Sequence, residues 1–121
     1  MLTLNIIGAG RAAQTLAYLW RQAGLLEIRA VVCRQLQHAR QAVTFIGAGK
    51  ATNELTQLPS ADIWLIATPD DQIQPVANQL AAAGIRGQSA FHLSGSLTAE
   101  QLAPLRSCGL TLASVHPIRS F

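Results

Sequence analysis

Residues 2–33 decide the fold, and they read "LTLNIIGAGRAAQTLAYLWRQAGLLEIRAVVC". The run Leu2–Ile7 is short, rich in strand-forming residues, and ends at a glycine. Over Arg11–Ala23 the apolar residues recur at helical spacing, and the next glycine is a natural helix stop. Glu27–Cys33 is predicted to be a second strand, in which Ile28, Ala30, Val31 and Val32 form a nearly continuous apolar run, typical of a strand covered on both faces. The stretch therefore predicts a strand, a tight glycine turn, a helix and a second, parallel strand.

The second Ile-Gly-Ala-Gly, residues 46–49, can be read in two ways. If "QAVTFI" before it is a strand, its glycines form another strand-to-helix turn. A parallel crossover needs about a dozen residues, however, and only nine separate Cys33 from Val43. We therefore favour a helix over Leu36–Ile46 that the glycines end, followed by a short strand over Lys50–Thr52.

Three later apolar runs are predicted to be strands: Asp62–Ala67, Ser89–Leu93 and Thr111–Val115. A helix is expected between the first two, where "TPDD" opens a segment that ends near Ala83. Thr98 and Gln101 form a capping-box pattern for another helix, which Pro104 should kink or split. The alternation indicates an α/β fold with an open, parallel, doubly wound sheet and helices on both faces. Residues 1–121 suffice for one domain.

The composition narrows the classes of partner. Half of the residues are apolar and only 12% are charged, which predicts a large core and apolar surface that contacts a ligand, a second domain or a second subunit. No membrane-length apolar run and no secretory leader are recognised. Cys33 and Cys108 have no metal-type spacing and fit a reducing cytoplasm, so we expect no metal site. The net charge of +3 comes from scattered residues, which argues against nucleic-acid binding.

The first glycine turn carries the pattern G-x-G-x-x-A in Gly8, Ala9, Gly10, Arg11, Ala12 and Ala13. Gly8 permits a tight turn off the strand, and Gly10 lets backbone N–H groups approach a pyrophosphate. Ala13 lets the helix lie close to the sheet, and the helix N-terminus offers donors and partial positive charge. We predict that these six residues bind a dinucleotide; the alternative is a purely structural turn. The second copy, "GAGK", lacks the spacing of a nucleotide P-loop and is predicted to have no ligand.

The end of the second predicted strand indicates which dinucleotide is bound. Folds that prefer NAD(H) place an acidic residue there to bind the ribose hydroxyls, whereas this chain has Cys33 followed by Arg34. An arginine pairs with a 2′-phosphate and stacks on adenine, so we predict a site for NADP(H) rather than NAD(H) at Cys33 and Arg34. Three basic residues are candidate helpers: Arg11, His38 and Arg40. The alternative for Arg34 is an ordinary solvated arginine.

Five segments together resemble the Rossmann-like proteins with a DUF2520 domain: "IIGAGRAAQTLA", "CRQLQHA", "DIWLIATPDD", "HLSGSLTAEQLAPLRSCG" and "SVHPIRSF". Those proteins are relatives of the ketopantoate, pyrroline-5-carboxylate and F420-dependent NADP reductases, within the 6-phosphogluconate-dehydrogenase-like group. The resemblance implies a Rossmann-type NAD(P)-binding domain, then a mainly helical C-terminal domain that helps to form the substrate pocket and often a homodimer. This chain ends at Phe121 and is expected to be the cofactor half of a larger protein, or a truncated relative.

Two loops after predicted strands hold further candidates, because ligands in open α/β sheets bind at the carboxyl ends of strands. The segment "ATP" resembles that of related reductases, which implies that Thr68 and Pro69 line the nicotinamide side. At least one of the two aspartates that follow is expected to cap a helix. Ser94 can donate a hydrogen bond to a substrate carbonyl or to the carboxamide, and Gly95 allows close approach. An ordinary Ser-Gly turn is the equal alternative.

His116 is the main catalytic candidate, and Ser94 is the other. His116 follows the last predicted strand and precedes a proline, and this "HP" resembles a segment of prephenate dehydrogenases in which a histidine faces the substrate. A histidine can pass a proton to or from a carbonyl or hydroxyl as hydride moves. The alternative is that His116 ties a loop to backbone carbonyls. His92 lies within a predicted strand and is expected to be structural.

The leading hypothesis is an NADP-dependent oxidoreductase domain that acts on a small carbonyl, imine or hydroxy compound. The alternative is a non-catalytic dinucleotide-binding module for regulation or assembly, because Lys50 is the only lysine and no catalytic lysine is in a plausible place. A flavin or F420 ligand would share the same glycine turn.

Overall fold

The computed structural model describes residues 1–56 and 58–115. Its strands are β1 (Leu2–Ile7), β2 (Leu26–Val32), β3 (Lys50–Thr52), β4 (Ile63–Ile66), β5 (Ser89–His92) and β6 (Thr111–Ser114). Its helices are α1 (Arg11–Gln22), α2 (Leu36–Ile46), α3 (Asp70–Ala82) and the 3₁₀ helix η1 (Ala99–Cys108). Every predicted element is present. The segment "QAVTFI" is helical, so its interpretation as a strand is wrong.

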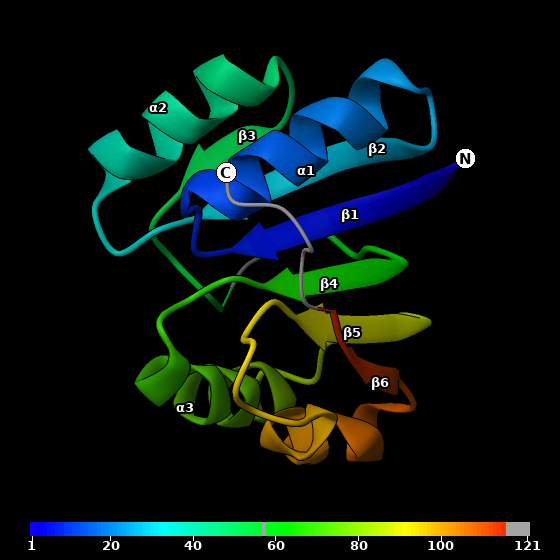
Figure 1. The fold of residues 1–121 in the computed structure, drawn as a ribbon. Helices are drawn as coiled ribbons and strands as arrows, with labels where there is room; N and C mark the ends of the chain where they lie inside the picture. The colour runs from blue at the N-terminus through cyan, green and yellow to red at the C-terminus, as the bar shows by residue number, and fades with distance from the viewer. Residues whose placement is uncertain (57, 116–121) are drawn as a thin grey trace.

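The strands form one parallel sheet in the order β3-β2-β1-β4-β5-β6 (Figure 1). The chain begins in the middle with β1, builds outward to β3, and crosses back to place β4 on the other side of β1. This is the order of doubly wound dinucleotide-binding folds, and the crevice at the reversal lies at the carboxyl ends of β1 and β4. The predicted fold class is confirmed.

Two hydrophobic cores cover opposite faces of the sheet. Successive strand residues point to opposite faces, so β4 sends Trp64 and Ile66 into the core beneath α3 and η1, and Leu65 into the core beneath α1 and α2. All three side chains are essentially inaccessible to solvent. Burial on both faces explains why these strands read as continuous apolar runs rather than as alternating ones.

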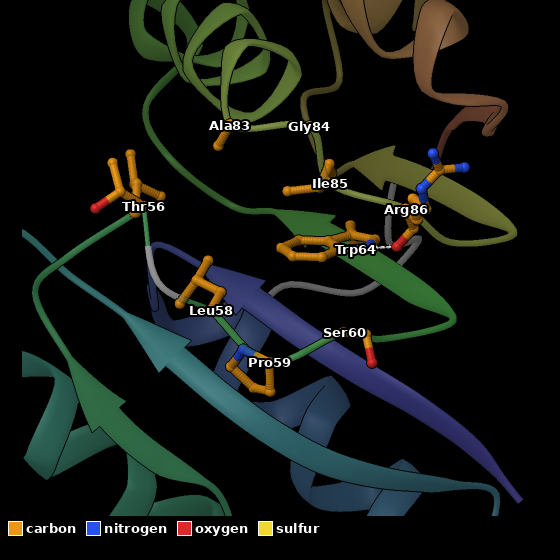
Figure 2. Close-up of a pocket in the computed structure, with 10 residues that line it drawn as sticks. Thr56, Leu58, Pro59, Ser60, Trp64, Ala83, Gly84, Ile85 and Arg86 are labelled. Carbon is orange, nitrogen blue, oxygen red and sulfur yellow. Dashed lines mark hydrogen bonds between the residues drawn. The ribbon is translucent and has the colours of Figure 1, made fainter.

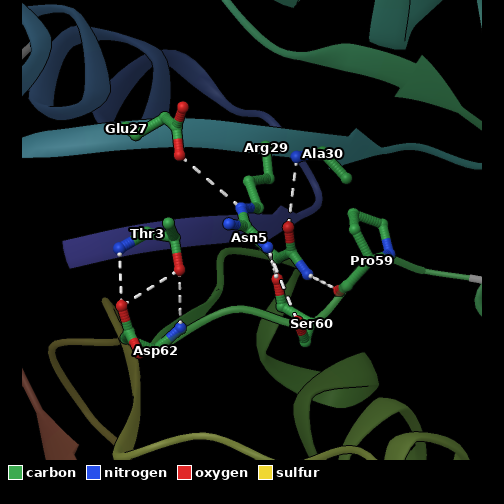
Figure 3. Close-up of polar contacts among 8 residues, drawn as sticks. All are labelled: Thr3, Asn5, Glu27, Arg29, Ala30, Pro59, Ser60 and Asp62. Carbon is green, nitrogen blue, oxygen red and sulfur yellow. Dashed lines mark hydrogen bonds and ion pairs between the residues drawn. The ribbon is translucent and has the colours of Figure 1, made fainter. Parts of the chain in front are cut away.

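Within the described part of the crossover from β3 to β4 no helix forms, and polar side chains of β1 hold this segment (Figure 3). The buried side chain of Asn5 donates from Nδ2 to the carbonyl oxygen of Pro59 at 2.8 Å and accepts at Oδ1 from the N–H of Ala30 at 3.1 Å. The register of β1 against β2 shifts at this asparagine. The Asn5 side chain therefore has two roles: it bonds to β2 where the register shifts, and it holds the crossover segment at Pro59.

Thr3 and Asp62 form a second tie between β1 and the start of β4 (Figure 3). The N–H and hydroxyl of Thr3 donate to the carboxylate of Asp62 at 2.9 and 3.1 Å. The N–H of Asp62 returns a bond of 2.9 Å to the Thr3 hydroxyl oxygen. These bonds position the entry of β4 beside β1, which places its exit next to the glycine turn.

The helix before β6 differs in type from the expectation. It is a 3₁₀ helix over its whole length. Pro104 has no N–H to give in either α-helical or 3₁₀ geometry, yet the 3₁₀ helix continues through it, so the predicted split is absent. Thr98 is the N-cap as predicted, and its side-chain oxygen accepts from the backbone N–H of Glu100 at 3.3 Å. The backbone N–H of Gln101 donates instead to the carbonyl oxygen of Thr98.

Candidate functional site

Gly8 makes the turn at the end of β1, and its role is steric. Its φ is +81°, in the region that favours glycine. A β carbon there would lie 2.9 Å from the carbonyl carbon and oxygen of Ala67, at the exit of β4. The Gly8 N–H donates to the carbonyl oxygen of Val32 at 2.7 Å. Only glycine fits between the ends of the two neighbouring strands.

Gly10 is the N-cap of α1 and has a different role. Its φ of −70° is open to any residue. A β carbon at Gly10 would meet no atom of the described residues within 4 Å, apart from its chain neighbours. In the described part of the chain no side chain caps α1, whose first turn begins at this glycine. The absent side chain leaves room beside the positive end of a helix, as the sequence predicts for a phosphate site.

The rest of the turn is held firmly from behind. Ala13 is buried in the core between α1 and the sheet, as predicted for close packing of this helix. The side chain of Gln14 donates from Nε2 to the carbonyl oxygen of Ala9 at 2.8 Å and closes the loop on itself. The turn is therefore preorganised by the chain's own residues.

A cavity of about 220 Å³ lies in front of this turn, at the carboxyl edge of the sheet. Its walls come from three segments that are distant in sequence: residues 10–13 of the turn, Ala67, Thr68 and Asp70 between β4 and the start of α3, and Leu93 and Ser94 after β5. The structure thus brings together six of the predicted site residues: Gly10, Arg11, Ala12, Ala13, Thr68 and Ser94. Gly8, Ala9, Cys33, Arg34, Pro69 and Gly95 lie outside its lining.

Thr68 supplies the most informative polar group of this cavity. Its hydroxyl oxygen is buried and has no hydrogen-bond partner among the described residues. Buried hydroxyls normally have a partner, because burying one without a hydrogen bond costs about 1–3 kcal/mol. A ligand that reached this oxygen would supply the missing partner, and an anionic part of that ligand would suit the N-terminus of α1.

Ser94 closes the loop after β5. Its hydroxyl oxygen accepts from the N–H groups of Ser96 and Leu97 at 3.2 and 3.1 Å. As an acceptor, Ser94 therefore behaves as expected for an ordinary Ser-Gly turn. Its own hydrogen faces the Ser96 hydroxyl oxygen at 3.4 Å, because the hydroxyl hydrogen of Ser96 is donated to Asp70.

The hydrogen bonds of His92 define its role. The His92 side chain is fully buried, its Nε2 lies 2.7 Å from the carbonyl oxygen of Thr98, and its Nδ1 accepts from the N–H of Ser94 at 3.1 Å. Because a carbonyl only accepts, Nε2 carries the proton, and both ring nitrogens are used. His92 is structural, as predicted. His116 lies outside the described residues.

The aspartates after Pro69 do not cap α3 through their side chains. Pro69 occupies the N-cap position, and Asp70 and Asp71 lie inside the first turn. The carboxylate of Asp70 accepts instead from the hydroxyl of Ser96 at 3.1 Å. The capping interpretation is wrong, because both residues lie one position or more too late to act as the N-cap. Their charges still complement the positive end of the helix.

Cys33 and Arg34 follow β2. Cys33 is half-buried, and burial raises the pKa of its thiol, so a reactive thiolate is disfavoured. The guanidinium of Arg34 donates to the side-chain oxygen of Gln72 in α3 at 3.0 Å. Arg34 is thus drawn toward the segment after β4 rather than away from the sheet. His38 and Arg40, the candidate helpers, are exposed residues of α2.

A second cavity, of about 250 Å³, lies beside the first half of β4 and the C-terminal end of α3 (Figure 2). Leu58, Trp64 and Ile85 give it apolar walls, and the indole N–H of Trp64 is already bonded to the carbonyl oxygen of Arg86 at 3.1 Å. It lies away from the carboxyl edge, where ligands bind in open α/β sheets. We assign no function to it.

Two classes of site were also tested within residues 1–56 and 58–115. No three His, Cys, Asp or Glu side chains of these residues are grouped so that they could hold a metal ion. No helix in these ranges has the length and apolar character required to cross a membrane.

A family model for the Rossmann-like domain matches residues 1–117. No curated protein matches the sequence. Similar solved structures include prephenate dehydrogenase from A. aeolicus in complex with hydroxyphenyl propionate and NAD+ (19% identity, TM-score 0.73, 98% of this chain and 42% of that one). Another is an NAD binding oxidoreductase from Klebsiella pneumoniae (20%, 0.70, 96% and 34%). A third, from Bacteroides fragilis and provisionally named an NADP oxidoreductase, has corresponding values of 22%, 0.69, 82% and 38%.

These identities are low, and the likeness establishes a shared fold. The chain spans between 34% and 42% of the length of these three solved structures.

Proposed function

The chain belongs to the Rossmann-like domain family, and from that premise we propose that it binds NADP(H) and is the cofactor domain of an oxidoreductase. The substrate would be a small carbonyl, imine or hydroxy compound. The observation that carries this proposal is the cavity lined by Gly10, which leaves space beside α1, and by Thr68, whose buried hydroxyl has no partner among the described residues. A dinucleotide offers an anion and polar groups to both.

The diphosphate would bind at the N-terminus of α1. Gly10 leaves space for it, and the first N–H groups of the helix supply donors in a region of positive potential. Gly8 and Ala9 would act by shaping the turn, since neither lines the cavity. Arg11 and Ala12 complete the wall on this side.

The choice of NADP(H) over NAD(H) rests on Arg34. The names of the similar structures include both NADP and NAD, and at this level of identity they do not decide the cofactor. Arg34 extends toward the crevice at the carboxyl end of β1 and carries the charge that a 2′-phosphate needs. Cys33 precedes it at the position where an acidic residue would repel that phosphate.

Bound cofactor would supply the hydride chemistry. The chain's residues would orient the reacting groups and hold protons. The hydroxyl of Thr68, with Pro69 beside it, would bond near the nicotinamide side. Ser94 would exchange its long, 3.4 Å contact with Ser96 for a hydrogen bond to a substrate carbonyl or to the carboxamide, with Gly95 admitting the ligand. His116 is proposed as the proton donor or acceptor from the sequence alone.

A partner is proposed for the surface outside the cavity, because the similar structures are longer than this chain. A helical C-terminal domain or a second subunit in a homodimer would complete the substrate pocket. The two free cysteines favour a reducing, cytoplasmic location.

The test is a fluorescence titration of the 121-residue chain with NADPH and with NADH. We expect tighter binding of NADPH, and we expect Arg34→Ala to remove the difference between the two cofactors. The matched control is Arg86→Ala, which removes the same charge from an exposed position before β5, beside the second cavity and away from the carboxyl edge. Absence of binding by both nucleotides at millimolar concentration would refute the proposal.

A non-catalytic dinucleotide-binding module is the second candidate, and one observation favours it. The oxygen of Ser94 is already occupied by two backbone N–H groups, which suits a structural role. A panel of carbonyl and imine substrates, tested with NADPH on the longest available form of the protein, separates the two candidates. Turnover of any member supports the enzyme, and intact cofactor binding with no turnover supports the module.

A further inference from the structure

One hydrogen bond joins the two segments that flank the glycine turn. Arg34 follows β2, and Gln72 lies in the first turn of α3, just after β4. In the sheet, β1 lies between β2 and β4. Neighbouring strands are about 4.8 Å apart, so the contact connects elements separated by roughly 10 Å. This bond therefore bridges the two sides of the crevice into which the turn after β1 opens.

The two partners are not equally fixed. Gln72 is half-buried, its N–H donates to the carbonyl oxygen of Pro69 at 2.8 Å, and the next residue, Ile73, is buried in the core beneath α3. Arg34 is exposed and lies between β2 and α2. The helix thus provides the anchor, and the long arginine side chain is the part that is positioned.

The chemistry of this anchor suits an arginine that must still bind an anion. An amide oxygen orients a guanidinium without neutralising its charge, whereas a carboxylate would form an ion pair and compete with an incoming phosphate. Among the ion pairs of the described residues, none involves Arg34. The carboxylate of Asp70, in the same turn of α3, accepts a hydrogen bond from the hydroxyl of Ser96 in the loop after β5.

We propose that Gln72 determines cofactor specificity by holding the guanidinium of Arg34 across the crevice, where it meets the 2′-phosphate of NADP(H). Gln72 is a positioning residue, since it acts through Arg34. This inference rests on the proposed function. It adds Gln72, a residue after β4, to the proposed 2′-phosphate site after β2.

The first test replaces the amide by a carboxylate of the same shape. In Gln72→Glu the new charge pairs with Arg34 and repels the 2′-phosphate, so NADPH affinity should fall about tenfold or more while NADH affinity stays near that of the unaltered chain. Gln74→Glu is the matched control, because it adds the same charge to an exposed position two residues further along α3. It should leave the ratio of the two affinities unchanged.

The second test asks whether Gln72 acts through Arg34. Gln72→Ala should reduce the preference for NADPH in the unaltered chain and have no effect on that preference in the Arg34→Ala background. Equal effects in both backgrounds would overturn the inference. It is also overturned if the unaltered chain prefers NADPH and Gln72→Glu keeps that preference, a result that leaves the proposed function intact. Failure of the unaltered chain to bind either nucleotide, or to distinguish them, removes both.

Discussion

At the scale of single residues, the two glycines of one motif have separable roles. Gly8 is required by its positive φ and by the carbonyl group of Ala67, so it belongs to the fold. Gly10 has an ordinary φ and open space beside it, so it belongs to the site. The sequence pattern predicts both glycines but assigns their roles only by analogy; the structure distinguishes them by what a β carbon would contact.

Valine substitutions at these positions should therefore fail in different ways. Gly8→Val should lower the free energy of unfolding by at least about 2 kcal/mol, through backbone strain and overlap with Ala67. Gly10→Val should leave stability nearly unchanged and abolish NADPH binding, because its side chain fills the space that the ligand needs. Thermal denaturation and fluorescence titration measure the two effects. Retention of NADPH binding by folded Gly10→Val would contradict the assignment of the diphosphate to this turn.

At Thr68 a substitution should weaken NADPH binding without lowering stability, because the hydroxyl has no hydrogen-bond partner among the described residues. Thr68→Val keeps the shape and removes that group, so the unliganded chain should be as stable as before or more stable. NADPH affinity should fall about three- to tenfold, the value of one hydrogen bond. Thr111→Val, at the start of the exposed edge strand β6, is the control and should leave the NADPH affinity unchanged. A loss of stability in Thr68→Val would show that the hydroxyl is satisfied without ligand.

At the scale of elements, periodicity predicted most of the structure. The strands β1 and β4 and the second half of β2 are buried on both faces, so their apolar runs were unambiguous, and the glycine caps marked where helices end. Two features were beyond the pattern. The helix type around Pro104 depends on competing hydrogen-bond geometries, and the role of Asn5 depends on a crossover that is distant in sequence. Gln72 was missed for the same reason, since its partner is 38 residues away.

The crossover between β3 and β4 yields a prediction at this scale. Asn5→Leu keeps the branched shape, with a larger volume, but leaves the N–H of Ala30 and the carbonyl of Pro59 without their partner. We expect the free energy of unfolding in urea to fall by about 2–4 kcal/mol, because both groups lose a buried hydrogen bond. Asn78→Leu, at an exposed position of α3, is the matched control and should change it little. Equal stability of the two variants would mean that the crossover is held by packing alone.

At the scale of the whole molecule, the sheet order concentrates the site at one edge. The reversal between β1 and β4 places the glycine turn, Thr68 and the loop after β5 around one cavity, although they span most of the chain. The helical layers behind them are held by two separate cores, so the turn is supported from both faces. This arrangement was predictable from the βα alternation, whereas the identity of a substrate depends on groups beyond the cavity.

The outer surface of α1 and α2 leads to the last prediction. The rings of Tyr18 and Phe45 pack as a tilted pair with 5.8 Å between their centroids, yet Phe45 is 53% exposed. Leu19, which follows Tyr18 in α1, is 50% exposed. With only 12% charged residues in the chain, few charges oppose contact between such surfaces. We expect sedimentation equilibrium to show weak, reversible self-association that Phe45→Lys reduces. Gln37→Lys, which adds the same charge at an exposed position of α2, should reduce it less, since it removes no apolar surface. A monomer at the highest soluble concentration would mean that this apolar surface does not drive assembly.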